Sequence, residues 1–222
     1  MLYAELGKPG RAVLVVRVIA AMTYNDGKDA SGAALSWTAK EKTNFAADVT
    51  KAINDVWAEK HRITTTSNGV AFPDVGVIFD LKFIEDLSMF SHSHRNITVT
   101  KTVGFHRSTT HDWWFELGRN NSADWGSQDA QPYQKQASVH LQRTCVHEFG
   151  HILGYRDEYP IKTGNPNWLK DVDSVMHSAE QVRDRHYTLF ADWLTRQHAI
   201  VNSKPPIEFK VNGVTTLLTA KL

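Results

Sequence analysis

The segment from His147 to Asp157 constrains the fold of this chain most. It predicts a helix, the residue at which that helix ends, and a loop that folds back toward the helix. It reads His147-Glu148-Phe149-Gly150-His151-Ile152-Leu153-Gly154-Tyr155-Arg156-Asp157. A spacing of four places His147 and His151 on one face of a helix, about one turn apart. Gly154 can adopt the left-handed conformation that ends a helix, after which the backbone can fold back toward the two imidazoles. The segment therefore predicts a helix, a glycine break and a loop that carries Asp157 to the histidines.

The residue types in this segment are those of a zinc site. Two imidazoles can bind one Zn²⁺ ion at ~2.0 to 2.1 Å from each nitrogen, and the carboxylate of Asp157 can add a third ligand. Three protein ligands leave one position open, which is typical of a catalytic rather than a structural zinc. Glu148 is expected on the flank of the ion, where a carboxylate can accept a proton from water. Glu158 stays open as the alternative third ligand.

The length of the motif separates it from coincidence. With 11 histidines in 222 residues, an H-E-x-x-H pattern arises by chance in roughly 2% of chains. Requiring the glycine and the final aspartate or histidine lowers this to roughly one chance in seven thousand. A charged helix face is the rival interpretation, and a purely structural zinc would leave Glu148 without a role. We therefore expect Glu148 to be catalytic.

Together with Ser174-Val175-Met176, this motif resembles the metzincin clan of zinc endopeptidases, in the variant whose third ligand is aspartate. The resemblance is sharp over residues 137 to 178 and topological before them. It implies a sheet with two helices, the second carrying the two histidines, and a methionine turn that forms a hydrophobic floor under the zinc. Met176 would be that methionine. Ser178 stands where some members carry a tyrosine that assists the oxyanion.

A second resemblance joins the motif to the last helix. The string from His147 to Tyr159, with Arg185-His186-Tyr187, is similar to bacterial peptidase domains, some of them attached to toxin-delivery machinery. It makes His186 and Tyr187 supporting candidates for the site. For His186 a place in the core is the alternative, because it lies on the apolar stripe of the expected helix.

The rest of the chain predicts an α/β (α+β) fold. Thr38 and Glu41 form a capping-box pattern that opens a long helix with an apolar stripe reaching Trp57. Asn212-Gly213 between two strand-like runs is a strong hairpin signal. The resemblance adds a twisted, mostly parallel sheet, an active-site helix, and a smaller C-terminal part with a methionine turn and a long C-terminal helix. The expected strands are 13–19, 75–84, 96–103 and 113–117, followed by an irregular stretch to about 136, and the later helices are 137–153 and 179–199.

We expect a metallopeptidase domain over residues 1–200. Its upper part would span 1–154 and its lower part 155–200, and residues 201–222 would form a C-terminal linker and β-hairpin appendage. Cys145 is the one cysteine, so no intrachain disulfide can form.

Composition excludes several partners. A formal charge of +1 and 22% charged residues give no basis for nucleic-acid binding. The apolar run 12–21 is too short to span a membrane, and the start lacks a signal peptide, which leaves signal-independent export from a bacterium and a cytoplasmic location both open. A monomer is favoured, although the sequence does not determine the oligomeric state.

The function expected is a zinc-dependent endopeptidase acting on protein or peptide substrates. The alternatives are a non-enzymatic, zinc-stabilised interaction module and a zinc amidase that acts on cell-wall peptide.

Overall fold

In a computed structural model, the chain folds into two compact units. The structure describes residues 2–4, 11–85, 95–110, 122–134, 139–159, 168–201 and 207–211. The first unit comprises Met1–Val16, Trp57–Asp80 and Val182–Leu222, and the second comprises Arg17–Val56 and Leu81–Gln181. Strands β2 (Arg11–Asn25) and β6 (Val70–Ile84) run through both units.

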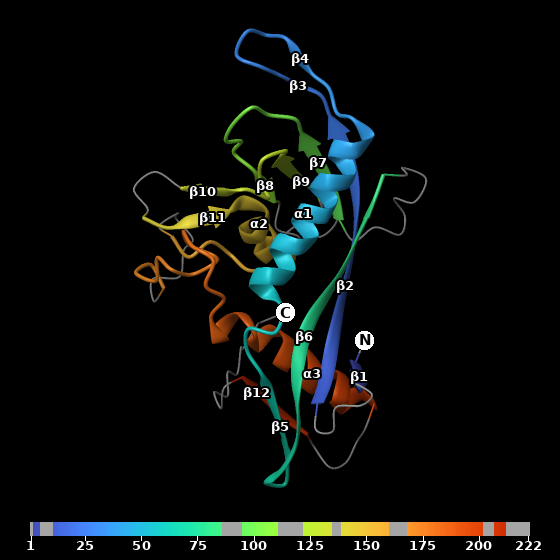
Figure 1. The fold of residues 1–222 in the computed structure, drawn as a ribbon. Coiled ribbons are helices and arrows are strands. Elements are labelled where there is room, and N and C mark those ends of the chain that lie inside the picture. The colour runs from blue at the N-terminus through green and yellow to red at the C-terminus, as the bar shows by residue number, and fades with distance from the viewer. Residues whose placement is uncertain are drawn as a thin grey trace. The chain divides into compact units, whose positions relative to one another are not determined.

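The sheet of the second unit is mixed (Figure 1). Strand β2 pairs in parallel with β7 (Arg95–Thr100), and β7 pairs in parallel with β9 (Ser122–Gly126). Strand β8 (Thr109–Thr110) adds an antiparallel edge to β9. Side chains of β7 alternate between buried and half-buried positions, as expected where one face of a sheet is covered. Two short ribbons complete the unit, β3 (Gly27–Lys28) with β4 (Ala34–Leu35) and β10 (Pro132–Gln134) with β11 (Leu141–Arg143).

Helix α1 (Ala39–Trp57) begins at the predicted capping box. The backbone nitrogen of Thr38 lies 2.8 Å from Glu41 Oε2, and the nitrogen of Glu41 lies 3.3 Å from Thr38 Oγ1. These bonds satisfy backbone donors that have no partner inside the helix. Its apolar stripe is buried through Phe45, Val49 and Ile53.

The core of the second unit joins both of its helices to the sheet. Ile53 of α1 and Phe149 of α2 (Thr144–Ile152) line one apolar region with Ile97 of β7 and Trp125 of β9, and all four are buried. Burying such a side chain stabilises the folded state by about 1.5 to 3 kcal/mol. This packing anchors the helix that carries the two histidines.

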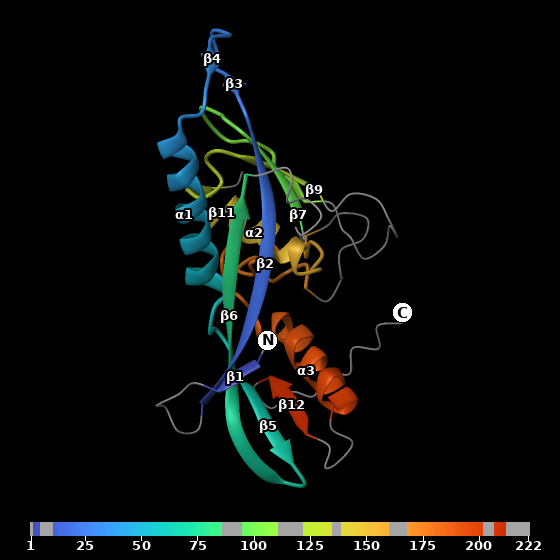
Figure 2. The same cartoon turned by 90° about the vertical axis from the view of Figure 1, so that its right-hand side faces the viewer.

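The first unit is built on antiparallel pairs. Strand β5 (Ile63–Ser67) pairs with β6 on one side and with β12 (Glu208–Val211) on the other, and β1 (Leu2–Ala4) pairs with β2. A short 3-10 helix, η2 (Asp184–His186), precedes α3 (Thr188–Val201), which lies beside β12 (Figure 2). Phe79 and Phe190 meet edge to face at 5.9 Å between ring centroids.

The α/β class is confirmed, and several boundaries are wrong. Residues 13–19, 75–84 and 96–103 do carry strands, but the stretch expected to be irregular contains β9 and β10. The expected helix 137–153 begins only at Thr144, because Leu141–Arg143 pair with β10 as β11. The expected helix 179–199 starts late, since Gln181 bridges to Ser174 in an extended arrangement and α3 begins at Thr188.

Other expectations fall partly outside the described residues. The strand expected at 113–117 lies outside them, as does the second half of the expected C-terminal hairpin. The first half of that hairpin is β12, and it pairs with β5. Trp193, which lies within the expected helix 179–199, is 43% exposed. Within the described residues, the helices are too short or too polar to cross a membrane. The boundaries expected at 154 and 200 stay predictions.

Candidate metal centre

Helix α2 presents the two histidines from a buried position. Every residue from Cys145 to His151 is buried, so the helix is held on more than one side. Arg143, just before it, is extended with φ −81° and ψ 120°. His147 and His151 follow one turn apart, and their rings meet edge to face at 4.9 Å between centroids.

Gly154 ends this helix with a backbone hydrogen-bond pattern known as the Schellman motif. Its φ is +97°, its nitrogen donates to the carbonyl of His151 at 2.9 Å, and the nitrogen of Tyr155 donates to the carbonyl of Gly150 at 3.0 Å. A residue with a Cβ atom is strained at this left-handed φ, whereas glycine is not. The predicted break is therefore confirmed, and the chain turns back toward the helix after it.

We expect Gly154→Ala to lower the free energy of unfolding by about 1 to 2 kcal/mol, because a Cβ is disfavoured in the left-handed region. Urea denaturation of zinc-free protein measures this change. Gly104→Ala is the matched control, since Gly104 does not have a positive φ and a Cβ there would meet open space. Equal stability of the two variants would contradict the role assigned to Gly154.

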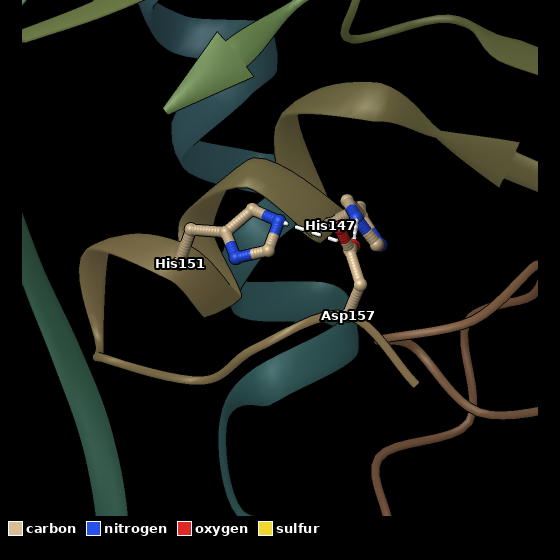
Figure 3. A group of neighbouring side chains, drawn as sticks. All are labelled: His147, His151 and Asp157. Carbon is tan, nitrogen blue, oxygen red and sulfur yellow. Dashed lines mark hydrogen bonds and ion pairs between the residues drawn. The ribbon is translucent and has the colours of Figure 1, made fainter. Parts of the chain in front are cut away.

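The loop after Gly154 brings Asp157 between the two imidazoles (Figure 3). Asp157 Oδ1 lies 3.0 Å from His147 Nε2 and 3.4 Å from His151 Nε2. Ligand atoms at ~2.0 to 2.1 Å from a tetrahedral zinc would stand about 3.3 Å apart. The two distances to Asp157 are compatible with this spacing, and the three side chains could hold a metal ion. Among the described residues they are the group with metal-ligand spacing.

The outer nitrogens of both imidazoles are held by backbone carbonyls. His147 Nδ1 lies 2.9 Å from the carbonyl oxygen of Val175, and His151 Nδ1 lies 2.7 Å from that of Tyr155. A carbonyl oxygen only accepts, so each Nδ1 must carry the proton. A proton fixed at Nδ1 leaves Nε2 as the nitrogen that faces Asp157. A protonated Nε2 donates a hydrogen bond to the carboxylate, whereas an unprotonated Nε2 offers the lone pair that binds a metal.

Charge at the centre also favours a cation between these groups. Burial alone would lower the pKa of His151, but its hydrogen bond to Asp157 and the charge of Glu148 raise that pKa to about 9. Burial would raise the pKa of Asp157, yet the hydrogen bonds from His147 and His151 hold it far below its usual range. Without a metal, a proton on an imidazole supplies the positive charge that the carboxylates require.

The zinc-free protein should lose stability as pH rises from about 6.5 to about 9. The pKa of folded His151 lies above its unfolded value, so its contribution is complete below about pH 6.5 and vanishes as pH passes 9. Urea denaturation of chelator-treated protein at several pH values measures this decline. His151→Gln should make the free energy of unfolding less dependent on pH in this range. An equal dependence in the variant and the wild type would contradict the assignment of the decline to His151.

Glu148 lies beside this group as a buried carboxylate with one oxygen unpaired. It is 5% exposed, and its Oε2 has no hydrogen-bond partner within the described part of the chain. Its charge is close enough to raise the pKa values of His151 and Tyr159. A buried carboxylate oxygen without a partner is costly for stability and typical of functional sites. Glu148 can therefore act as a proton acceptor.

A second buried carboxyl, Asp129, lies near Glu148. Burial, the largest cause, and the charge of Glu148 together raise its pKa to about 7, against the hydrogen bonds from Ser108 and Gly126. Ser108 Oγ lies 2.5 Å and the nitrogen of Gly126 3.0 Å from Asp129 Oδ2. These two hydrogen bonds hold the turn after β9 in place.

Tyr159, the last residue of the string that begins at His147, also belongs to the site. Its hydroxyl makes a hydrogen bond with Asp157, and burial and the charge of Asp157 raise its pKa. Its ring stacks on that of His147 at 6.1 Å between centroids and meets that of His177 at 5.8 Å. In the sequence, only its position two residues after Asp157 points to the site. That position does not distinguish a residue that contacts the candidate ligands from one that packs elsewhere on the loop.

The methionine turn contacts the centre through its backbone. Met176 is fully buried, and its carbonyl accepts a hydrogen bond from the nitrogen of Glu158 at 2.9 Å. Val175 accepts from His147, so the turn touches both the helix and the ligand loop. The role of Met176 as a floor under the zinc stays a prediction. Asp157, not Glu158, is the carboxylate that lies between the histidines.

His186 and Tyr187 have the contacts of core residues in the first unit. His186 Nδ1 accepts from the nitrogen of Arg183 at 3.0 Å, and its ring lies 5.8 Å from that of Trp57. The Tyr187 hydroxyl donates to the carbonyl of Trp57 at 2.5 Å and accepts from the nitrogen of Lys60 at 3.0 Å. The core interpretation of His186 is thus supported, and a supporting role for either residue at the metal stays a prediction.

Comparison of the chain with protein-family models, with curated proteins and with solved structures gives no match. The metzincin resemblance therefore rests on the motif and on the residues described above.

Proposed function

We propose that this protein is a zinc-dependent endopeptidase of the metzincin type, with His147, His151 and Asp157 as the zinc ligands and Glu148 as the general base. One observation carries the proposal. Two imidazole nitrogens and a carboxylate oxygen converge within 4.8 Å of one another, and each imidazole is held in the metal-binding tautomer by a backbone carbonyl.

The residues divide the chemistry between them. When bound, zinc supplies Lewis-acid chemistry, since it makes water more acidic and polarises the scissile carbonyl. Glu148 accepts a proton from the attacking water and passes it to the nitrogen of the leaving amine. One water is consumed, a carbon–oxygen bond forms and the peptide carbon–nitrogen bond breaks. Tyr159, whose hydroxyl bonds to Asp157 and whose ring stacks on His147, would keep these two ligands oriented.

The unpaired oxygen of Glu148 favours an enzyme over a zinc-stabilised interaction module. A structural zinc closes its coordination with protein ligands and gives a neighbouring carboxylate no task. Here a fourth protein ligand is missing from the group formed by the described residues, and a buried carboxylate lies next to it. This combination is the one that hydrolysis requires.

Side-by-side digestion of casein and of muropeptides tests the proposal. Zinc-loaded protein should cleave casein, and a chelator should stop the cleavage. Cleavage of muropeptides alone would favour the cell-wall amidase. Stoichiometric zinc binding without hydrolysis of either substrate would favour the interaction module and contradict the proposed function.

A further inference from the structure

The residues just before α2 hold the methionine turn in place. Gln142 is 1% exposed, and its Nε2 lies 2.9 Å from the carbonyl oxygen of Val175 and 2.5 Å from that of Ala179. One side-chain amide has two N–H groups, so it satisfies both carbonyls. The reverse orientation would place Oε1 against two carbonyl oxygens, which fixes the direction of the amide.

The carbonyl of Val175 is shared between this amide and a metal ligand. It accepts from Gln142 Nε2 on one side and from His147 Nδ1, at 2.9 Å, on the other. The orientation of a metal-binding histidine depends on the acceptor of its other nitrogen, and loss of such an acceptor typically costs 10- to 100-fold in metal affinity. Gln142 is therefore two hydrogen bonds away from the metal position.

An ion pair and a polar contact flank the amide. Arg143 donates through its backbone nitrogen and Nε to Glu180 Oε1, at 2.7 and 2.9 Å, and through Nη2 to Oε2 at 2.7 Å. His140 Nε2 lies 2.9 Å from Asp173 Oδ1. These side chains are 20% to 40% exposed, and pairs near the surface contribute little. A buried carbonyl left without a hydrogen bond lowers the stability of the fold far more. The amide of Gln142 therefore contributes most to the contact between β11 and the turn from Val175 to Ala179.

We propose that Gln142 is a positioning residue of the metal centre. Its amide fixes both ends of the turn from Val175 to Ala179, and thereby holds the carbonyl that orients His147. The inference rests on the proposed function only in that it requires zinc at the His147, His151 and Asp157 group.

Gln142→Met tests the inference, because methionine keeps the length of the side chain and removes both N–H donors. The zinc dissociation constant of the variant should rise by up to about 10-fold, the lower end of the effect of losing the direct acceptor, measured against a competing chelator. The visible spectrum of cobalt-substituted protein should also change, since it reports the geometry of the ligands. Both measurements are made well below the unfolding temperature of each variant.

Val49→Ala is the matched stability control. Val49 is fully buried in α1, a helix that carries none of the proposed ligands, so this variant should lose stability and keep the wild-type zinc affinity and cobalt spectrum. If Gln142→Met does not fold, Gln142→Asn keeps the amide one methylene short and should give a smaller rise in the dissociation constant. Variants at Gln142 that lose stability but keep wild-type zinc affinity and cobalt spectrum would overturn the inference alone. A wild type that binds no zinc would overturn the proposed function with it.

Discussion

Asp157→Asn should weaken zinc binding by more than about 100-fold, because the variant loses the anionic ligand that lies 3.0 Å and 3.4 Å from the two imidazole nitrogens. Loss of a direct ligand should exceed the 10- to 100-fold effect of changing a residue behind the ligands. Competition with a chelator measures the affinity. Thermal unfolding in excess zinc adds a second readout, since a ligand that binds only the folded state raises its stability.

Glu158→Gln is the matched control for this variant. Glu158 is buried, whereas Asp157 is half-buried, and the backbone nitrogen of Glu158 donates to the carbonyl of Met176, a bond that the substitution keeps. Zinc affinity should stay within a few-fold of wild type. If Glu158→Gln abolished zinc binding while Asp157→Asn retained it, Glu158 would be the third ligand and the proposed centre would be wrong.

Glu148→Gln should lower kcat/KM by about 10²- to 10⁴-fold while zinc stays bound at one ion per chain. A glutamine keeps the shape of the side chain but cannot accept the proton from water, and general-base catalysis typically contributes an effect of this size. Cleavage of a fluorogenic peptide measures turnover, and metal analysis of the same sample measures zinc.

Glu41→Gln provides the control for the loss of a carboxylate. Glu41 caps α1 on the surface of the same unit, where glutamine is also accepted, so turnover should remain at the wild-type value. Cleavage that survives in Glu148→Gln would remove Glu148 from the mechanism. Loss of zinc in that variant would instead assign Glu148 to the ligands.

Local signals predicted the parts of the fold that depend on neighbouring residues. The capping box at Thr38 and the stripe from Phe45 placed α1 correctly, because both signals lie inside the helix itself. Strand β5 and the β10–β11 ribbon were missed. They are short, and β5 consists mostly of threonine, so the pairing partners rather than the apolar pattern determine them.

The start of α2 shows the same limit. Leu141–Arg143 is extended because Gln142 and Arg143 bond to the segment from Val175 to Glu180, more than thirty residues later in the chain. A helical pattern read over the local window carries no trace of those contacts. The predicted helix therefore began too early, at 137.

The candidate ligands could be predicted from the sequence, but the groups that hold them in place could not. Spacing and residue type indicate His147, His151 and Asp157, since metal ligation depends on side-chain chemistry. The carbonyls of Val175 and Tyr155 hold the outer nitrogens of the imidazoles. Every residue has such a carbonyl, so no sequence signature marks these two.

Digestion of a peptide library by the zinc-loaded wild-type protein, followed by mass spectrometry, tests the central claim most directly. We predict internal cleavage of library peptides that stops when zinc is removed by a chelator and returns when zinc is added back. Intact peptides after incubation with protein that holds one zinc per chain would contradict a peptidase function.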